Sequence, residues 1–434
     1  MRMRAAVFCG FFTTTEPTTR MRATTLLRIM FVLKLTRVTR ASTGPFGIVT
    51  TVAPATRVPI CSGCMCRARW AYDRDRREWR HLDASGMETT LLYDLRRVDC
   101  RRCGVRTELV PWADTGSRFT RDFEDHVAYL AQGTDRTTVA TTMRIAWRTV
   151  GSIVARVVAR LRSGDSLDGL EHIGVDELSY RKHHEYITVV LDHGAGRVVW
   201  AAPGKNAATL KEFFAALGAA RSAKLKTVTM DMSQAYINAV HACAPNARVV
   251  FDRFHVQRLA HDALDEVRRD QMRKLAGTDE GKSIKKTRWA LHKNPWNLTG
   301  LEHDKVAQVQ RANRPLYRAY LLKESLAGIL GRRQLHVARA KLHEWIAWAA
   351  RSRLPAFKKL AKTIRRHLDG ILGYIATGLS NGPVEGLNGK IRTITRRAYG
   401  FHNAANLIAF IFLCCTRLVL RPVFKTPVSH PLEC

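Results

Sequence analysis

The chain has 434 residues, of which 46% are hydrophobic and only 14 are proline, so disorder over most of its length is excluded and several buried cores are expected. Its 71 Lys and Arg against 37 Asp and Glu give a net charge of +34 and a pI near 10.5. This excess predicts a polyanionic partner, DNA or RNA ahead of a membrane surface, with a ribosome-associated or simply basic protein as the alternative. No stretch of about 20 apolar residues lacks charge, so no membrane span is expected.

The first 57 residues carry many Arg and Thr and a single acid, Glu16. This composition resembles a transit leader, but an artefact of start-codon choice is an open alternative because Met21 begins a more ordinary segment. We therefore expect residues 1–21 to be a non-native or disordered extension. Between residues 22 and 60, short apolar runs alternate with turn residues such as Gly44-Pro45, which predicts a small β element.

Two CxxC pairs follow this element, Cys61/Cys64 and Cys100/Cys103. Each pair can present two thiolates, and two pairs complete the closed tetrahedral shell of a structural Zn²⁺. Ten cysteines without a convincing signal peptide fit a reducing compartment and a metal site better than a disulfide framework. Chance clustering and a redox CxxC are the alternatives, and Cys66 could compete as a ligand. Redox chemistry is disfavoured because no thioredoxin-like context surrounds the pairs.

Arginines surround the cysteine pairs, which predicts contacts with DNA phosphates. We expect residues 22–112 to form a zinc-ribbon DNA-binding domain in which Arg101 and Arg102 touch DNA. The full set near the cysteines is Arg67, Arg69, Arg96, Arg97, Arg101, Arg102 and Arg106. The later cysteines Cys243, Cys414 and Cys415 lie in apolar runs and are expected in the core.

Residues 115–165 show the spacing of three helices. The first begins near Phe119 and closes at Gly133, the second is short, and the third carries an apolar stripe from Val150 to Leu161. This predicts a helix-turn-helix domain whose third helix enters DNA, with Arg144 and Arg148 as contacts. Arginines on the polar side favour that interpretation: Arg136, Arg144, Arg148, Arg156 and Arg160. An ordinary three-helix linker remains open.

Five apolar runs then predict strands, three joined by tight turns and two separated by helices. They are His172 to Tyr180, Tyr186 to Asp192, Arg197 to Ala202, Thr227 to Asp231 and Arg248 to Phe254. The order matches an α/β fold of the ribonuclease H-like class. We expect residues 170–256 to form the first part of this core, 257–375 a basic all-α insertion, 376–420 the second part and 421–434 a tail.

Two acids in these strands are candidates for catalysis. Asp176 lies inside an apolar strand and Asp231 ends another, and a buried acid is costly unless it is paired or bound to a metal. The first and fourth strands of such a sheet are neighbours, so the two carboxylates can share a site. Hard oxygen ligands without a nearby lysine favour Mg²⁺. Glu177 is adjacent but should point to the opposite face.

The segment from Ser380 to Arg392 is the best source of a third acid. Pro383 suits a first helical turn, and Glu385, Asn388 and Arg392 then recur on one side. A separate apolar face is formed by Leu387, Ile391 and Ile394. By spacing alone, a solvated surface glutamate is the main alternative to a catalytic one.

Several motifs together resemble the ISL-three family of bacterial insertion-sequence transposases, over about residues 22–420. They are Gly174-Val-Asp-Glu, Asp231-Met-Ser-Gln-Ala-Tyr, Phe251-Asp-Arg-Phe-His-Val, Ser380-Asn-Gly-Pro-Val-Glu-Gly-Leu-Asn and Gly400-Phe401. The cysteine pairs, the helix-turn-helix pattern, Lys293-Asn-Pro-Trp-Asn-Leu and Trp345-Ile-Ala-Trp also fit the family. The resemblance implies a DDE triad of Asp176, Asp231 and Glu385 that binds Mg²⁺ or Mn²⁺. It does not cover the extension before Met21.

The resemblance further implies recognition of terminal inverted repeats, hydrolysis at the element ends and joining of 3′ hydroxyls to target DNA. Asn388, Lys390 and Arg392 are expected to contact the double-stranded DNA. Two ends must be held together, so a homodimer or larger synaptic complex is expected, in the bacterial cytoplasm and associated with the nucleoid. A non-catalytic zinc-ribbon and helix-turn-helix regulator, and a ribonuclease H-like nuclease that cuts without joining, are the alternatives.

Two further features are left with open roles. Asp252 and His255 form an Asp-x-x-His spacing similar to one in several transposase groups, which would order the active site or contact DNA; a helix cap with a surface histidine is the alternative. For Trp289 and Trp296 we favour core packing over stacking on an unpaired base. Trp345 and Trp348 are expected to be structural.

Overall fold

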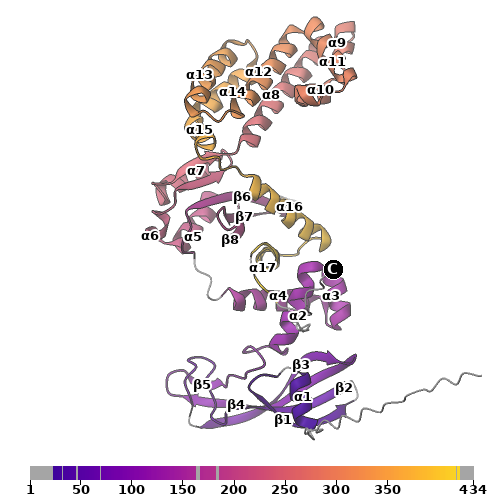
Figure 1. Cartoon of the computed structure of the whole chain (residues 1–434), viewed down its shortest axis with the longest axis vertical. Helices are drawn as coiled ribbons and strands as arrows, with labels where there is room; N and C mark the ends of the chain where they lie inside the picture. The colour runs from indigo at the N-terminus through magenta and orange to yellow at the C-terminus, as the bar shows by residue number, and fades with distance from the viewer. Residues whose placement is uncertain are drawn as a thin grey trace, which may run out of the picture. The chain divides into compact units, whose positions relative to one another are not determined.

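The computed structural model describes residues 23–420 except 32, 45, 46, 69, 163–166, 182–184 and 417. The predicted extension 1–21 and tail 421–434 lie outside the described residues. The chain divides into an N-terminal unit, Met1–Leu130 with Leu420–Cys434, and a main unit, Ala131–Val419 (Figure 1). Across the described ranges, no helix has both the length and the apolar character that a membrane span needs.

The N-terminal unit is built on one sheet of order β1-β2-β4-β3, with β5 paired to β4. Its elements are α1 (Ala23–Met30), β1 (Thr36–Gly44), β2 (Gly47–Pro54), β3 (Ala71–Ala84), β4 (Met87–Cys100) and β5 (Gly104–Thr107). The predicted β element is confirmed by β1 and β2, but the first part of that segment forms the helix α1 instead of a strand. A helix forms there because Leu27 and Phe31, four residues apart, pack against the same core. The long strands β3 and β4 were missed because their exposed faces are rich in charge.

Aromatic side chains fill the core of this unit. The Trp112 ring lies edge-to-face against Trp79 and Tyr93, at centroid separations of 5.6 and 5.5 Å. Leu91 and Val52 are fully buried beside them. This packing anchors the sheet whose far end carries the cysteine pairs.

A buried histidine makes the stability of this unit depend on pH. His81 Nδ1 lies 2.9 Å from Thr120 Oγ1, and Nε2 lies 3.1 Å from the Phe31 carbonyl. Burial lowers the pKa of His81 from 6.5 to about 4. The unfolded chain therefore binds a proton that the folded unit excludes, so stability is full above pH 6.5 and falls as pH drops towards 4, by up to about 3 kcal/mol.

The measurement is chemical denaturation of wild type and His81→Leu between pH 7 and pH 4. Wild type should lose its stability advantage over the variant as pH falls. Comparing the two chains removes any shared effect of acid on the cysteines. Parallel pH profiles would contradict this assignment.

The main unit contains a five-stranded sheet of order β10-β9-β6-β7-β8. Its elements are β6 (His172–Arg181), β7 (Glu185–Asp192), β8 (Arg197–Pro203), α5 (Ala207–Leu217), α6 (Ala219–Ser222), β9 (Thr227–Met230), α7 (Gln234–Cys243) and β10 (Arg248–Phe251). β6, β7 and β8 are antiparallel neighbours, whereas β9 runs parallel to both β6 and β10. The five predicted strands are confirmed, and so is the pairing of the first with the fourth. β10 ends at Phe251, since Asp252 begins the next helix.

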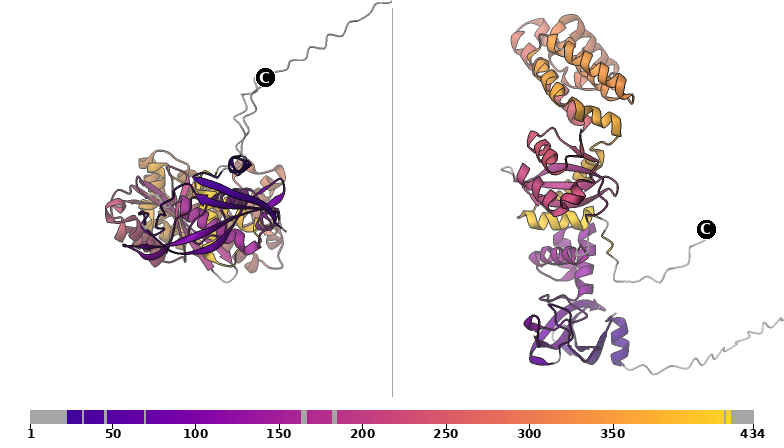
Figure 2. Two further views of the ribbon diagram at one scale, coloured as in Figure 1. Left: turned by 90° about the horizontal axis from the view of Figure 1, so that it is seen from below. Right: turned by 90° about the vertical axis from the view of Figure 1, so that its left-hand side faces the viewer.

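From Arg253 to Thr377 every described element is helical, and α8, α12, α13 and α14 pack together (Figure 1). The right-hand view of Figure 2 shows this helical segment from another side. The elements are α8 (Arg253–Lys274), α9 (Asp279–Ile284), α10 (Arg288–His292), η1 (Pro295–Asn297), α11 (Gly300–Ala312), α12 (Arg314–Leu330), α13 (Leu335–Arg351), α14 (Pro355–Arg366) and α15 (Leu368–Thr377). Leu264, Leu326, Trp345 and Phe357 are buried between these helices. Because α8 follows β10 directly, it connects this bundle to the sheet.

Five more helices, α2, α3, α4, α16 and α17, complete the main unit and its border. α2 (Arg121–Gly133) includes the boundary between the units and is followed by α3 (Arg136–Met143) and α4 (Trp147–Leu161). The last described elements are α16 (Gly382–Arg397) and the apolar α17 (Ala404–Cys415), which contacts both α4 and β8. The predicted stripe on α4 is buried from Val150 to Val158, while Leu161 is exposed.

Candidate functional site

The two predicted strand acids line one pocket. Asp176 lies in β6 and Asp231 directly follows β9, and the pairing of these strands ends at Gly174 and Thr229. The pocket has a volume of about 500 Å³ and also receives Glu385 from α16. Its lining residues are Asp176, Glu177, Asp231, Phe254, His255, Arg258, Glu385, Asn388 and Arg392. Acids far apart in sequence thus meet at the open edge between β6 and β9.

A glycine in β6 lets α16 approach the sheet. A Cβ atom at Gly174 would lie 2.5 Å from Val384 Cγ2, 3.0 Å from His193 Nε2 and 3.1 Å from Thr229 Oγ1. The Thr229 hydroxyl donates to Asn381 Oδ1 at 2.6 Å, so the start of α16 is also hydrogen-bonded to β9. Only a residue without a side chain fits this approach, which sets where Glu385 lies, one residue beyond Val384.

Asn388 holds Asp176 in place. It is buried, and its Nδ2 donates to Asp176 Oδ2, while the Glu177 N–H donates to Oδ1 at 2.7 Å. Burial raises the pKa of Asp176, and the nearby Asp231 charge adds to this rise. The predicted DNA contact at Asn388 stays a prediction, and its amide nitrogen is engaged with Asp176. The spacing placed Asn388 with Glu385, but it lies on the packed face with Val384 and Ile391.

Glu177 enters the same pocket from the other side of β6. Its side chain interacts with Tyr236 of α7, whereas Asp176 interacts with α16, as strand alternation predicts. Burial raises the pKa of Glu177. Both residues nevertheless line the pocket, because β9 no longer covers the edge of β6 beyond Gly174. Glu177 is thus a pocket residue that the strand pattern had set aside.

His255 lies between two carboxylates. Its Nδ1 is 2.9 Å from Asp231 Oδ1 and 3.6 Å from Asp252 Oδ2. These carboxylates raise the pKa of His255 to about 10, so the ring is charged at neutral pH. Asp252 is fully buried, and neither of its carboxylate oxygens has a hydrogen bond of regular geometry. The same holds for Asp231 Oδ1 and His255 Nδ1. The contacts are therefore ionic.

This geometry tests the helix-cap interpretation of the Asp-x-x-His spacing. Asp252 stands at the start of α8 but its side chain makes no cap hydrogen bond, and His255 is not a surface residue. The helix-cap alternative is wrong. Arg258, one turn beyond His255 on α8, also lines the pocket and was missed. Its spacing after the Asp-x-x-His pair was the available signal.

Two cationic residues of α16 differ in their surroundings. Arg392 is exposed and lines the pocket, so its predicted contact with DNA stays a prediction. Lys390 is also exposed, but it donates through Nζ to the Cys414 carbonyl at the end of α17. That bond stabilises the last turn of α17, and the predicted DNA contact of Lys390 stays a prediction.

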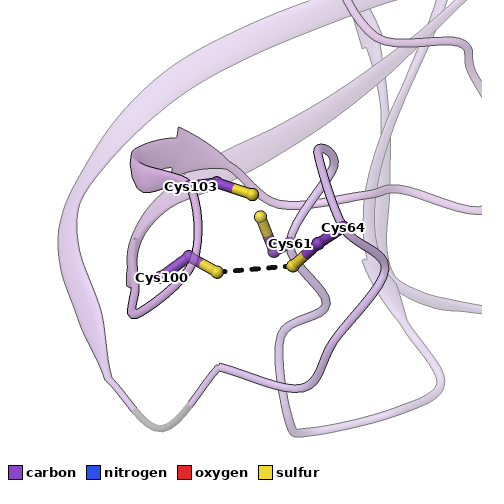
Figure 3. A group of neighbouring side chains, drawn as sticks. All are labelled: Cys61, Cys64, Cys100 and Cys103. Carbon is purple, nitrogen blue, oxygen red and sulfur yellow. Dashed lines mark hydrogen bonds between the residues drawn. The ribbon is translucent and has the colours of Figure 1, made fainter.

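The N-terminal unit brings the four predicted cysteines together. Cys61, Cys64, Cys100 and Cys103 point towards one another from two loops (Figure 3). Among the described residues they are the only group of three or more His, Cys, Asp or Glu whose ligand atoms all lie within 4.8 Å of one another. The Cys64 and Cys100 sulfurs are 3.4 Å apart, too far for a disulfide. Cys66 lies outside the cluster, and its thiol is 3.6 Å from the Cys64 carbonyl.

Some arginines near the cysteines have structural roles. Arg96 forms a bidentate ion pair with the buried Glu108, which also accepts from the Tyr93 hydroxyl. Arg97 pairs with Asp73. Arg101 and Arg102 are exposed in the loop between Cys100 and Cys103, where DNA contact stays a prediction. The acidic partners of Arg96 and Arg97, Glu108 and Asp73, could not be predicted from the sequence, because the pairing of the strands was not known.

Family comparisons agree with this arrangement. Residues 57–103 match the model described as zinc-finger of transposase IS204/IS1001/IS1096/IS1165. Residues 108–158 match the helix-turn-helix domain of transposase family ISL3, and residues 173–411 match the transposase model of that family. The chain belongs to the ISL3 family of transposases. The family resemblance seen in the sequence is confirmed, and the protein is a DNA transposase.

Two relatives resemble this transposase over most of its length. The transposase for insertion sequence element IS1557 of Mycobacterium tuberculosis is 40% identical over 396 residues, covering 86% of this chain and 88% of the relative. The transposase for insertion sequence element IS1001 of Bordetella parapertussis is 30% identical over 354 residues, covering 81% and 87%. These matches favour a transposase over a regulator that only binds DNA.

In this ISL3 transposase the turn between α3 and α4 is tight. Arg144 ends α3 in a left-handed conformation, with φ of 52°, and Arg148 lies in the first turn of α4; both are exposed. Their positions suit the predicted DNA contacts, which stay predictions. Arg136 was assigned to the polar side, and this is wrong, because Arg136 is only 3% exposed and lies over the Trp147 ring.

The tryptophans of the helical segment divide differently from the prediction. Trp345 is buried, as expected, and its Nε1 donates to the Leu322 carbonyl at 2.8 Å. Trp289 and Trp296 are 69% and 77% exposed, so core packing is wrong for both. Trp348 is also partly exposed, at 37%. The short helices that carry Trp289 and Trp296 lack the long apolar stripe from which burial could be predicted.

Proposed function

We propose that the pocket containing Asp176, Asp231 and Glu385 cleaves DNA at the ends of an insertion sequence and transfers the 3′ ends to target DNA. The observation that carries the proposal is the meeting of three acids from β6, β9 and α16 in one pocket, with Asp176 held by Asn388. The sheet order, with a three-stranded antiparallel part followed by two parallel strands, supports a ribonuclease H-like core. In this proposal the helices from Arg253 to Thr377 form an insertion between the second and third acids.

The donor set suits hard divalent cations. Four carboxylates line the pocket, Asp176, Glu177, Asp231 and Glu385. Asp231 Oδ1 is buried without a hydrogen bond, although it lies near charged His255. Asp176, Asp231 and Glu385 would hold Mg²⁺ or Mn²⁺, which activates an attacking water or 3′ hydroxyl and stabilises the leaving oxygen. Burial next to a second acid disfavours the charge on Asp176, and a cation would relieve that cost.

The surrounding residues position these acids and the phosphate. Asn388 and the Glu177 N–H fix both oxygens of Asp176, so the carboxylate keeps one orientation. His255 offsets part of the negative charge of Asp252 and Asp231 and holds Asp231 beside β9. Arg258 and Arg392 line the pocket and are suited to the scissile phosphate and the strand that carries it.

The other modules would select and assemble the DNA. The cysteine cluster supports Zn²⁺ binding in the zinc ribbon, which with the helix-turn-helix would recognise terminal inverted repeats. Joining two ends requires both to be held at once, so we propose a homodimer or larger synaptic complex. Its site of action would be DNA of the bacterial nucleoid in the cytoplasm.

The deciding experiment incubates purified protein and Asp231→Ala with labelled DNA carrying the ends of its own element, with and without magnesium. We expect magnesium-dependent cleavage and 3′ end joining by wild type and neither by the variant, with binding retained in both. Binding without cleavage by wild type would overturn the proposal and support a regulator. Cleavage without joining would support a nuclease.

A glycine substitution should disturb the same site from a distance. Gly174→Ala would push α16 away from β6, because the new Cβ would lie 2.5 Å from Val384 Cγ2. Asn388 and Glu385 would move with α16, and we expect cleavage to fall about a hundredfold with unchanged DNA binding. Gly389→Ala on the same helix is the control, since a Cβ there meets nothing within 4 Å. Equal cleavage rates in the two variants would exclude this role of Gly174.

A further inference from the structure

A second pocket of the main unit lies where α3 and α4 meet the end of β6 and the chain after α16. Its volume is about 480 Å³. The lining residues that matter here are Arg136, Trp147, Arg181, Arg397, Tyr399 and His402. It combines helix-turn-helix residues with residues of the sheet and of α16, and the chemistry proposed above uses none of them.

Arg136 is a buried cation that has no acidic partner in the part of the chain that the structure describes. It is 3% exposed, its Nε has no hydrogen bond, and its Nη2 donates only to the Trp147 carbonyl at 3.4 Å. Among the described residues, no Asp or Glu forms an ion pair with it. The guanidinium lies 3.5 Å from the Trp147 ring centroid, which compensates part of the cost of burial. Burial lowers the pKa of Arg136, as expected for a cation that lacks a counter-charge.

The space for this guanidinium is created by a glycine within α4. A Cβ atom at Gly151 would lie 2.7 Å from Arg136 Nη2. A glycine inside a helix costs about 1 kcal/mol relative to alanine, so the helix gives up stability to admit the guanidinium. The space that Gly151 leaves for the Arg136 guanidinium is therefore a specific feature of the packing of α4.

The other charges around the pocket leave positive charge in excess. Arg397 donates to the carbonyls of Gln132 and Ala131, at 3.1 Å each, and carbonyls do not neutralise its charge. Arg181 is 3.5 Å from Glu185 in an exposed, weak pair. The lining acid Asp135 accepts hydrogen bonds from the first turn of α3. A pocket with these three guanidinium groups is suited to a phosphate.

An aromatic ring stands at the rim of the same pocket. Tyr399 is 94% exposed and has a φ of 52°, in the left-handed region that favours glycine, and it is followed by Gly400 with φ of 98°. A tyrosine in this conformation costs about 1 kcal/mol. Its exposed ring can stack on a base, a contact that does not depend on base identity. Guanidinium groups that can bind a phosphate, beside an exposed aromatic ring, are the elements of a nucleotide site.

The pocket lies along α16 from the three acids. Glu385 and Arg392 of α16 line the first pocket, and Arg397 of the same helix lines the second. At 1.5 Å per residue, the helix rises about 18 Å from Glu385 to Arg397. We propose that the second pocket binds one unpaired nucleotide of the DNA strand that enters the active site, with its phosphate at Arg136, Arg181 and Arg397 and its base on Tyr399. This rests on the proposed function, because it takes DNA as the substrate.

The test measures binding of a fluorescein-labelled duplex with a single-stranded 3′ overhang, and of the blunt duplex, in buffer without magnesium. Tyr399→Ala should weaken binding of the overhang duplex about tenfold, which is the loss of one stacked base, and leave blunt-duplex binding unchanged. Tyr399→Phe should restore overhang binding. Arg181→Ala and Gly151→Ala should weaken overhang binding selectively as well.

Arg314→Ala is the matched control, because Arg314 is exposed and lines neither pocket. It should weaken both duplexes equally through lost charge alone. If Tyr399→Ala also weakens both equally, or neither, the proposal is overturned. Displacement of the overhang duplex by ATP would likewise overturn it, in favour of a free nucleotide. Because cleavage is not measured, failure of the catalytic proposal remains distinguishable.

Discussion

Glu385→Gln is expected to reduce DNA cleavage and joining by about a thousandfold or more while leaving DNA binding unchanged. The amide keeps the size of the side chain but removes the charge that would hold a divalent cation in the pocket. A loss of about 4 kcal/mol in transition-state stabilisation corresponds to this factor. Glu385 is exposed on α16, so the substitution should not disturb the packing of Val384 and Ile391.

Glu177→Gln is the matched control, since both glutamates line the same pocket. Glu177 is half-buried and engaged with Tyr236, and we expect its substitution to slow cleavage far less than that of Glu385. Single-turnover cleavage rates with magnesium, at saturating protein, separate chemistry from binding. If Glu177→Gln abolished cleavage and Glu385→Gln did not, the third acid of the site would be Glu177.

The strands of the core could be predicted because their apolar runs are continuous and end in turns. The same pattern placed Asp176 and Asp231 at adjacent strands, since three strands joined by tight turns leave the edge of the first strand for the fourth. Both the strands and the placement of the two acids could be predicted from local sequence patterns, without knowledge of contacts between distant residues. This is why these two acids have the firmest physical argument of the three.

The roles of the α16 residues could not be predicted in the same way. Helical spacing put Asn388 beside Glu385, but the packing of α16 on Gly174 turns Asn388 inward to Asp176. Lys390 similarly meets the end of α17, an element whose position depends on tertiary packing. A period of 3.6 residues gives relative directions around a helix, and only the neighbouring sheet decides which direction is inside.

The charged strands β3 and β4 show the same limit in the N-terminal unit. Arg96 looked available for DNA, yet the pairing of β4 with β5, which Glu108 directly follows, sets Arg96 against this buried acid. Cysteine spacing was more informative, because a CxxC turn constrains its two sulfurs locally and a metal site needs two such turns. The four sulfurs therefore could be grouped without knowing the sheet that brings the pairs together.

Cys100→Ser is expected to remove zinc and unfold the part of the N-terminal unit around the cysteines. The buried apolar residues at this end are few, namely Cys61, Ala68, Val98 and Cys100, so the core alone provides little stability. Zinc binding in small zinc domains contributes about 10–16 kcal/mol, far more than such a cluster. Zinc content should fall from about one ion per chain to near zero, and proteolysis should become rapid within residues 57–107.

Cys66→Ser tests whether this effect belongs to the cluster. Cys66 lies between β2 and β3, as Cys61 and Cys64 do, but it is outside the group of four sulfurs. The Cys66→Ser variant should therefore keep zinc and resist proteolysis. Loss of zinc from Cys66→Ser with retention in Cys100→Ser would reassign the fourth ligand. The expected pattern also separates the two units: Cys100→Ser should weaken DNA binding, whereas the sheet that carries Asp176 and Asp231 has its own core and should stay folded.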